Sequence, residues 1–289
     1  MKKILITGAN GFIGRNLAEY LDTEYNVVAI SRKEADLLDQ RQVEKLFQKE
    51  DIDVVIHAAT QGTLGRGKEY EQALLKNNLS MFFHLERCHA AYGKLIVLGS
   101  GAEYGKECEL SLVEEEAFDT VIPGDDYGFS KYIMSKAILN SSNIYNLRLF
   151  GIFGPYENYN YRFISNIICK ALLKNKIVIH QNVVFDYLYI KDFCRAIPWF
   201  VEHKLKRRCY NVCTGKPQDI VSLAREIVNQ VGNKCEIEIE IPGWNREYTG
   251  SNRRWLEEMG TFEFTPMEQA IAELIEYYKK TPFCLEGDY

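Results

Sequence analysis

Several features of disulfide-stabilised, metal-binding and membrane proteins are missing from this sequence. Its eight cysteines are scattered along 289 residues without a C-x-x-C pair, which indicates reduced thiols in a cytoplasm rather than a disulfide framework or a zinc site. The five histidines form no H-E-x-x-H pair, so no metal is predicted. No apolar run approaches the length that crosses a bilayer, and the chain begins directly on an expected strand. Neither a membrane partner nor a signal peptide is therefore expected.

An excess of positive charge is also missing. The 35 Lys and Arg residues are outnumbered by 40 Asp and Glu residues, which gives a net charge of −5. That balance leaves no basic footprint for nucleic acid. Apolar residues make up 46% of the chain and charged residues 26%, as in ordinary soluble globular proteins. The length is enough for one large α/β unit or for two lobes.

What the sequence does have is a glycine-rich turn near its start. An apolar run at 3–7 leads into Gly8, Gly11 and Gly14, and apolar residues at helical spacing follow. Glycines allow positive φ and close backbone approach, and a helix N-terminus offers free N–H groups, so such a turn suits a pyrophosphate. The spacing differs from the usual G-x-G-x-x-G fingerprint. A plain Gly-rich turn is the alternative, but the position between strand and helix favours nucleotide binding.

The residues after the second expected strand, 27–30, bear on the choice of cofactor. An acidic residue there hydrogen-bonds the ribose 2′-hydroxyl of NAD, whereas an Arg accommodates the 2′-phosphate of NADP. Here Ser31, Arg32 and Lys33 follow the strand. A planar guanidinium suits a phosphate dianion, and the serine hydroxyl adds a second donor. We therefore expect NADP(H), with a solvated basic turn as the alternative.

Strand-like and helix-like segments alternate along the first half of the chain. The apolar runs lie at 3–7, 27–30, 53–57, 94–98 and 143–150, and the helical patterns between them include 69–92 and 127–140. This alternation predicts an α/β fold with a doubly wound parallel sheet of the Rossmann type. The third run ends in Ala58 and Ala59, whose small side chains let a cofactor lie against the backbone. His57 beside them is expected to be a packing residue.

The second half of the chain has a different character. Helices are expected at 163–174, 191–202 and 220–231, and strands at 177–179, 183–189, 209–213 and 236–241. The last of these strands alternates Glu and Ile, which predicts one exposed face. We expect residues 1–155, with about 183–213, to form the cofactor domain. Residues 156–182 and 214–289 would form a smaller mixed substrate lobe that closes over it.

Three polar residues could carry the chemistry. Tyr127 and Lys131 lie four apart on an expected helix and so share a face. A phenol titrates near pH 10 and is a poor acid at neutral pH, but a nearby ammonium lowers its pKa, and it can then exchange a proton with a substrate oxygen. Ser100 ends the fourth expected strand and could hold the same oxygen. A Tyr and a Lys at this spacing often occur by chance on helices. A glycine turn upstream and Ser100 at a strand end make a chance pairing much less credible here.

Five motifs together resemble the extended short-chain dehydrogenase/reductase family, over residues 3 to about 232. They are Thr7-Gly8-x-x-Gly11-x-x-Gly14, His57-Ala-Ala59, Ser100 four residues before Tyr104-Gly105, Tyr127-x-x-x-Lys131 and Leu147-Arg-Leu-Phe150. The resemblance implies an enzyme acting on nucleotide-diphosphate sugars. Tyr127 would be the acid/base, Lys131 would lower its pKa and hold the nicotinamide ribose, and Ser100 would bond the sugar oxygen. It also implies a homodimer built from the helices at 69–92 and 127–140.

The family resemblance extends to particular contacts. It implies that the cofactor touches Gly8, Asn10, Gly11, Phe12, Ile13, Gly14, Ser31, Arg32, Asp36, Leu37, Ala58, Ala59, Tyr127, Lys131 and Phe150. Substrate contacts are expected from Ser100, Tyr127, Arg162 and Arg246. The two arginines are candidates for the diphosphate because Phe185 stands where family members usually carry an Arg before Asp-Tyr.

Differences from particular members of the family narrow the choice of reaction. The segment from Ser31 to Asp39 looks most like GDP-fucose synthase, which uses NADPH. That enzyme also epimerises, with a Cys and a His where this chain has Ala102 and Tyr156. The 4,6-dehydratases carry an Asp-Glu pair where this chain has Gly101-Ala102. Arg32 argues against the epimerases that retain NAD and have an acidic residue after strand two.

The function that these differences predict is that of a cytoplasmic, NADPH-dependent 4-ketoreductase. Its substrate would be a nucleotide-linked 4-keto-6-deoxy sugar, in deoxysugar or surface polysaccharide biosynthesis. An NDP-sugar epimerase with tightly held NAD is the alternative. A regulator that binds NADP without turnover is a more distant one, since such proteins usually lack the catalytic Tyr. The nucleotide, the sugar and the stereochemistry at C4 are left open.

Overall fold

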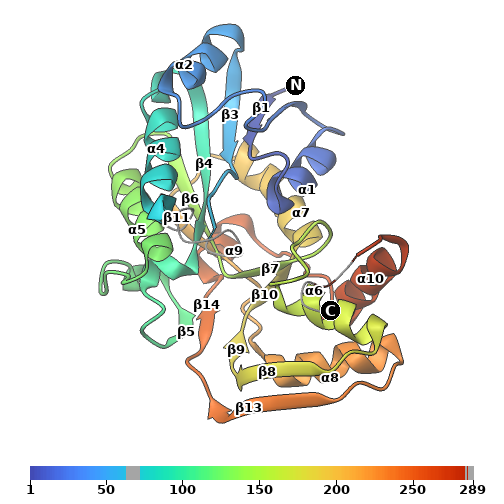
Figure 1. Ribbon diagram of the computed structural model, residues 1–289. Coiled ribbons are helices and arrows are strands. Elements are labelled where there is room, and N and C mark those ends of the chain that lie inside the picture. Colours follow the sequence, from blue (N-terminus) through green and yellow to red (C-terminus); the bar gives the residue numbers. More distant parts are fainter. Residues whose placement is uncertain (63–71, 284, 286–289) are drawn as a thin grey trace.

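Six parallel strands form the central sheet. The computed structural model describes residues 1–62, 72–283 and 285. The strands are β1 (Lys3–Thr7), β2 (Asn26–Ile30), β3 (Ile52–His57), β4 (Tyr92–Ser100), β6 (Ile144–Leu149) and β11 (Cys209–Val212). They lie in the order β11-β6-β4-β3-β1-β2, and every neighbouring pair is parallel (Figure 1). The carboxyl ends of all six therefore meet at one edge, where ligands of such sheets bind.

Helices cover both faces of this sheet. Successive strand residues point to opposite faces, so Ile4 and Ile6 belong to one buried cluster and Leu5 to another. The first face is covered by α1 (Phe12–Leu21) and α7 (Ile190–Glu202), and the second by α2 (Gln40–Lys49), α4 (Leu74–Glu86) and α5 (Asp126–Leu139) (Figure 1). The predicted doubly wound α/β fold is confirmed.

The C-terminal part adds helices and small sheets at one end of the molecule. Its helices are α6 (Phe163–Leu173), α8 (Ile220–Val231), α9 (Arg253–Met259) and α10 (Met267–Lys280), and two parallel strands, β8 (Ile177–Asn182) and β13 (Ile237–Trp244), form a ribbon beside α8 (Figure 1). Trp255 of α9 is fully buried in the cluster that covers the first face of the main sheet. The two parts therefore share a continuous core.

Short strands bring distant segments to the carboxyl edge of the main sheet. One small sheet has the order β12-β9-β14-β5, built from Gln218–Asp219, Val184–Phe185, Tyr248–Gly250 and Leu110–Val113. Another pairs β7 (Gly151–Phe153) with β10 (Tyr187–Tyr189). This arrangement places Tyr248 beside residues that follow β4.

Some expectations from the sequence differ from the structure. The strand expected at 183–189 is divided into β9 and β10, which belong to different sheets. The helix expected at 69–92 is described only from residue 72 onward, and α4 ends at Glu86; a 3-10 turn, His89–Ala91, and then β4 follow. Tyr92 is in β4 because it pairs with Ile52 of β3. The loop expected at 60–68 lies mostly outside the described residues. β13 is more exposed than expected since it has one partner strand, β8, and its Ile239 and Ile241 are about 40% exposed.

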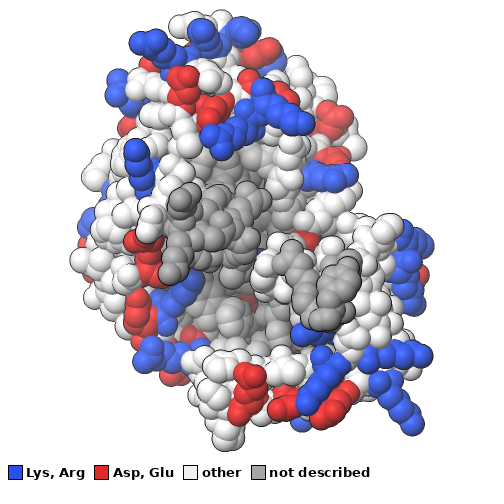
Figure 2. Space-filling model, in the orientation of Figure 1, with Lys and Arg blue, Asp and Glu red and all other residues white. Residues whose placement is uncertain are grey.

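None of the described helices is long and apolar enough to cross a membrane. On the face drawn in Figure 2, Lys and Arg side chains are interspersed with Asp and Glu.

Candidate active site

The glycine turn lies at the carboxyl end of β1. Gly8 has φ +69° and its Cα faces the backbone of Ala59, so that a Cβ there would lie 2.7 Å from Ala59 N. Gly11 precedes α1 as its N-cap residue. A Cβ on Gly14 would lie 2.3 Å from the Gly8 carbonyl oxygen. The glycines therefore let the turn, α1 and the end of β3 pack against each other, as a dinucleotide-binding turn requires.

A cleft of about 320 Å³ opens beside this turn. Its lining includes nine of the residues predicted to bind the cofactor: Gly8, Asn10, Gly11, Ser31, Arg32, Asp36, Leu37, Ala58 and Ala59. The donors and small residues of this lining fit a dinucleotide. Phe12, Ile13 and Gly14 pack beneath the turn instead, with both apolar side chains against the core. Tyr127, Lys131 and Phe150 lie toward the ends of β4 and β6.

The end of β2 carries carboxylates as well as the predicted cation. Arg32 is exposed, and its guanidinium makes an ion pair with Asp36, Nη2 to Oδ2 at 3.0 Å. Ser31 donates from both its N and its Oγ to Glu34 Oε2, at 2.8 and 2.6 Å. Sequence reasoning missed Glu34, because its side chain folds back across a turn. The end of β2 therefore holds both a cation that suits the 2′-phosphate of NADP and carboxylates that suit the ribose 2′-hydroxyl of NAD.

His57 is a packing residue, as expected. Its ring is buried, and Nδ1 lies 2.9 Å from the hydroxyl of Thr7 on the neighbouring strand. Burial lowers the pKa of His57 to about 3, and the charge of Lys131 acts in the same direction. The His57 ring at the end of β3 is therefore neutral at physiological pH. Among the described residues, no group of three His, Cys, Asp or Glu side chains could hold a metal.

Ser100 and Tyr127 meet at the carboxyl edge of the sheet. Ser100 is the last residue of β4, and Tyr127 lies in the first turn of α5, which begins at Asp126 after an N-cap hydrogen bond from Gly128 N to Asp125. Burial raises the pKa of the Tyr127 phenol, while the Ser100 hydrogen bond and the Arg162 charge oppose that rise. The net shift is upward, which contradicts the lowering expected from the sequence.

Lys131 is buried one turn further along α5. Its Nζ donates to the Leu98 carbonyl at 2.9 Å and lies 5.8 Å from the centre of the Tyr127 ring. Burial lowers the pKa of this ammonium to about 8, against the effect of the Glu103 carboxylate. Lys131 is thus held near Tyr127 but shares no hydrogen bond with it among the described contacts, and so the expected electrostatic help to the phenolate is weak.

A buried ion pair fixes Ser100 from behind. Glu103 and Arg148 are both almost fully buried and lie 2.7 Å apart, Nε to Oε2. Glu103 Oε1 also accepts from Ser100 N at 3.0 Å, and its other oxygen accepts from Ser135. Because both oxygens are satisfied within the protein, Glu103 positions the serine and is not available as a base.

Tyr248 is a site residue that sequence reasoning missed. Its hydroxyl lies against Gly101, where a Cβ would be 2.8 Å away, and it hydrogen-bonds Ser100. Burial raises the pKa of this phenol strongly, so it stays neutral and can donate. Its ring packs on Phe150, with centroids 5.3 Å apart. Tyr248 is distant in sequence and belongs to no motif, so only the pairing of β14 with β5 and β9 brings it here.

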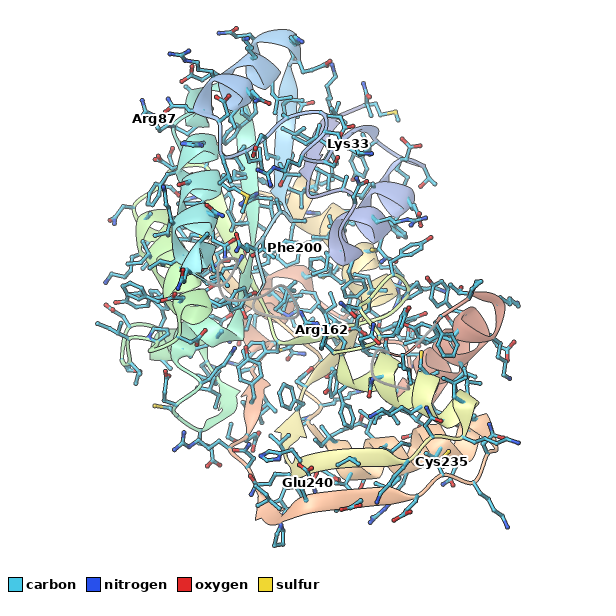
Figure 3. All side chains as sticks on the ribbon, viewed as in Figure 1. Lys33, Arg87, Arg162, Phe200, Cys235 and Glu240 are labelled. Carbon is cyan, nitrogen blue, oxygen red and sulfur yellow. The ribbon has the colours of Figure 1, made fainter. Side chains whose placement is uncertain are left out.

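The two arginines proposed for the diphosphate lie in different surroundings. Arg162 is the N-cap residue of α6. Burial raises the pKa of Tyr127, Glu157 and Tyr187, and the Arg162 charge opposes that rise in each. Arg162 therefore borders the site, between the sheet and the C-terminal part (Figure 3). Arg246 is exposed in the connection from β13 to β14, and no described contact joins it to Ser100 or Tyr127.

Glu157 is a buried acid near Arg162. Its Oε2 accepts from Ser165 Oγ at 2.7 Å. Burial raises the pKa of Glu157 to about 8, opposed by that hydrogen bond and by the Arg162 charge. The carboxyl group is therefore mostly protonated at neutral pH.

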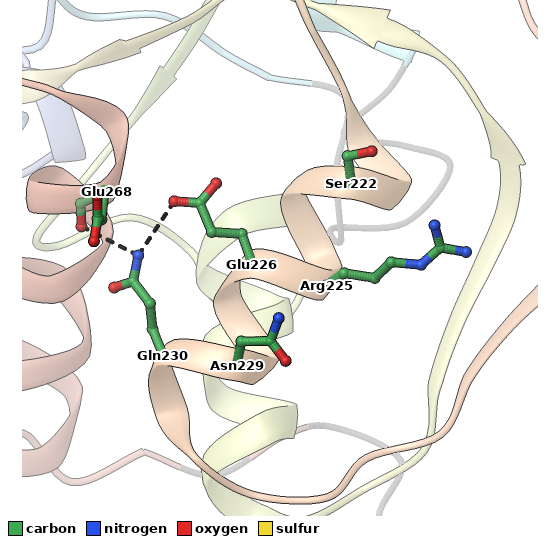
Figure 4. A pocket seen from close by; sticks show the side chains of 6 residues that line it. All are labelled: Ser222, Arg225, Glu226, Asn229, Gln230 and Glu268. Atoms are coloured by element: carbon green, nitrogen blue, oxygen red, sulfur yellow. Dashed lines mark hydrogen bonds between the residues drawn. The ribbon is translucent and has the colours of Figure 1, made fainter.

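A second hollow lies on the outer surface of α8, away from these residues. It measures about 570 Å³ and is lined by five α8 residues and Glu268 of α10 (Figure 4). Gln230 Nε2 crosses it to Glu226 Oε1 and to the Glu268 carbonyl, both at 3.3 Å. It shares no lining residue with the dinucleotide cleft, and neither Ser100 nor Tyr127 lines it.

Comparison with known proteins agrees with this geometry. In sequence, the chain is 22% identical over 319 residues to the trifunctional UDP-glucose 4,6-dehydratase/UDP-4-keto-6-deoxy-D-glucose 3,5-epimerase/UDP-4-keto-L-rhamnose-reductase of Arabidopsis thaliana, covering 97% of this chain and 48% of that protein. The chain thus spans about half of that relative's length. It is 24% identical over 331 residues to the ADP-L-glycero-D-manno-heptose-6-epimerase of Cupriavidus pinatubonensis, covering 95% and 98% of the two.

A solved structure and a family profile complete the comparison. The GDP-L-fucose synthetase of Naegleria fowleri bound to NADP superposes with a TM-score of 0.84 at 20% identity, covering 96% of this chain and 92% of that one. At this identity the likeness shows the fold alone. Residues 4–213, well over half of the chain, match the NAD dependent epimerase/dehydratase profile. The chain therefore belongs to the NAD dependent epimerase/dehydratase family, which confirms the resemblance that its motifs carry.

Proposed function

We propose that the protein reduces the 4-keto group of a nucleotide-diphosphate 4-keto-6-deoxy sugar with NADPH. The observation that carries the proposal is the meeting of Ser100 and Tyr127 at the carboxyl edge of the sheet, next to a cleft that fits a dinucleotide. Arg32 lines this cleft and is exposed, which supports a role in binding the 2′-phosphate of NADPH. The bound cofactor supplies the hydride that reduces the sugar carbonyl.

The residues of this chain supply the remaining steps. The Ser100 hydroxyl donates a hydrogen bond to the carbonyl oxygen and stabilises the charge that grows there. The Tyr127 hydroxyl would give its proton to the same oxygen when the carbonyl is reduced, which would leave the C4 alcohol and a phenolate. Tyr248 is placed to donate to the same oxygen or to a neighbouring sugar hydroxyl. Arg162 suits the substrate diphosphate.

The surroundings of Ser100 favour simple reduction over proton abstraction from carbon. Ala102 and Gly101 offer no acid or base, and Glu103 is fully used by its hydrogen bonds. Tyr156, in the place of the histidine of GDP-fucose synthase, lies against α1. Its hydroxyl donates to Glu19 at 3.1 Å and Arg15 covers its ring.

An NDP-sugar epimerase with tightly held NAD is the second candidate. The observation that favours it is the pair of carboxylates at the end of β2, Glu34 and Asp36, since an acidic group there suits the ribose 2′-hydroxyl. The heptose epimerase among the relatives points the same way. An epimerase would retain its cofactor through purification, whereas a reductase releases it.

A substrate panel tests the proposed reaction. The purified protein is mixed with NADPH or NADH and with the 4-keto-6-deoxy forms of dTDP-, GDP-, CDP- and UDP-hexoses. We expect loss of nicotinamide absorbance with one of them, and faster with NADPH. A changed sugar without net oxidation of the cofactor would identify an epimerase and contradict the proposal.

Tyr127→Phe tests the assigned proton donor. The loss of the hydroxyl should reduce kcat by roughly 10²-fold or more, while cofactor binding stays within a few-fold of wild type. Tyr132→Phe is the matched control, because this hydroxyl lies on the same helix and bonds Asp119 instead. Full turnover by Tyr127→Phe would remove Tyr127 from the mechanism.

Assembly and location complete the proposal. We expect a homodimer that buries α4 and α5 against the same helices of a second copy. Light scattering on the purified protein measures this directly, and a monomer at micromolar concentration would contradict it. The described cysteines are all free thiols, which supports a cytoplasmic location.

A further inference from the structure

A hollow of about 430 Å³ lies beside β11, the edge strand of the main sheet. Five of its lining residues are cations, namely Arg148, Lys206, Arg207, Arg208 and Arg254, and its acidic member is Glu115. It shares no lining residue with the dinucleotide cleft. The side chains of Phe118 and Leu139 add an apolar wall. The hollow is therefore a concave, strongly basic site that the proposed reaction does not use.

Two of the five cations are committed to carboxylates. Arg148 is bound to Glu103 at 2.7 Å, deep in the core. Arg254 contacts Glu115 at 3.5 Å and also pairs with Glu116. Their charges are compensated within the protein, so they form the fixed wall of the hollow.

The other three cations have no compensating carboxylate among the described contacts. Lys206 and Arg207 are exposed, and the nearby Glu258 carboxylate accepts from the backbone N of Lys206 and from the Tyr210 hydroxyl instead. Three adjacent positive charges repel each other in a chain whose net charge is negative. A bound anion would relieve that repulsion.

Arg208 is held in position for such an anion. Its carbonyl accepts from Asn146 N at 2.8 Å, and its guanidinium carbon lies 4.9 Å from the centre of the Tyr145 ring. One guanidinium nitrogen, Nη1, is buried without a hydrogen-bond partner among the described residues. Because Nη1 has no accessible surface, an anion in the hollow would bind the guanidinium through its other donors. Arg208 lines the hollow, and its ring contact with Tyr145 holds the side chain in place.

We propose that this hollow is an anion site that binds a phosphate group through Lys206, Arg207 and Arg208. A phosphate carries two charges at neutral pH and several acceptor oxygens, which match a planar guanidinium fork together with two further cations. The volume also admits a phosphate ester or a diphosphate. The inference is independent of the reaction assigned to Ser100 and Tyr127.

Calorimetric titration with inorganic pyrophosphate at low salt tests the proposal. The dinucleotide cleft is first saturated with NAD⁺ or NADP⁺, whichever the protein binds, so that it cannot take up the probe. We expect saturable binding by the wild-type chain. Arg208→Gln should weaken it roughly tenfold or more, and the exposed pair Lys206→Gln/Arg207→Gln should do the same without affecting folding. Titration with ADP compares an esterified phosphate with the free anion.

Two controls make the outcome decisive. Lys204→Gln changes a neighbouring cation that does not line the hollow and should leave binding unchanged. Arg162→Gln removes the cation proposed for the substrate diphosphate, so the titrations are repeated in this variant, where binding at the hollow should persist. Absence of saturable binding by wild type would overturn the proposal. Binding that survives Lys206→Gln/Arg207→Gln in the Arg162→Gln background, or that Arg162→Gln alone abolishes, would overturn it too.

Discussion

Burial controls the protonation of the residues around the proposed catalytic tyrosine. Tyr127 and Tyr248 are kept neutral, and Lys131 has its pKa lowered to about 8. A neutral phenol is the form that gives up a proton to an alkoxide, which is what reduction requires. The motif pointed to Tyr127 and Lys131 but not to Tyr248, and the expected lowering of the Tyr127 pKa was wrong. Burial depends on how the C-terminal part covers the sheet edge, and motif spacing does not contain that information.

Glu157 provides a test of the same effect at one residue. Its pKa is raised from an ordinary 4.5 to about 8, so between these values the folded chain holds more protons than the unfolded chain. This contribution to stability is fully present below about pH 4.5 and is lost as pH rises through about 8. Because Gln cannot ionise, the Glu157→Gln variant should not show this fall in stability as pH rises.

Glu157→Gln should therefore gain stability relative to wild type on going from pH 5 to pH 9, by on the order of a few kcal/mol. Urea unfolding at the two pH values measures the gain. The control is Glu257→Gln, in which the replaced side chain is 68% exposed. Equal pH dependence of Glu157→Gln and wild type would show that this carboxyl ionises freely in the folded chain.

At the scale of elements, regular periodicity was enough to locate most helices. The expected helix at 220–231 coincides with α8, and 163–174 differs from α6 by one residue. The expected helix at 69–92 was too long at its C-terminal end because strand pairing claims Tyr92. The exposure of β13 was underestimated, because alternation of polar and apolar residues does not reveal how many partner strands are present. Contacts such as Tyr248 on Ser100 depend on pairings between distant strands, and a single sequence gives no signal for them.

Close packing of the glycine turn, which is proposed to hold the cofactor, predicts that an added side chain will disturb it. A Cβ on Gly14 would lie 2.3 Å from the Gly8 carbonyl oxygen, a backbone atom that cannot move without shifting the turn or α1. Gly14→Ala should lower the free energy of unfolding by roughly 1–3 kcal/mol and weaken dinucleotide binding by about tenfold or more.

Thermal unfolding and a cofactor titration measure these two effects. Gly62→Ala is the control, because no atom of the described residues lies within 4 Å of the Cβ it adds. Near-wild-type cofactor affinity in Gly14→Ala would mean that the turn does not hold the pyrophosphate.

At the scale of the molecule, one parallel sheet edge collects groups from both ends of the chain. β1 to β6 bring the cofactor turn, Ser100 and Tyr127 together, and the C-terminal part contributes Tyr248 and Arg162. The division into residues 1–155 with about 183–213, and 156–182 with 214–289, stays a prediction. The shared core predicts that the two parts unfold together.

Transfer of hydride from the cofactor to the sugar is the step that separates a reductase from an epimerase. The protein is incubated with NADPH deuterated at C4 of the nicotinamide, in separate samples for each face, and with the keto sugar selected by the panel. If the protein is a 4-ketoreductase, one of the two labels is transferred in full to C4 of the sugar, which mass spectrometry and NMR detect. A sugar that changes configuration while the cofactor keeps its deuterium would rule out reduction and identify an epimerase.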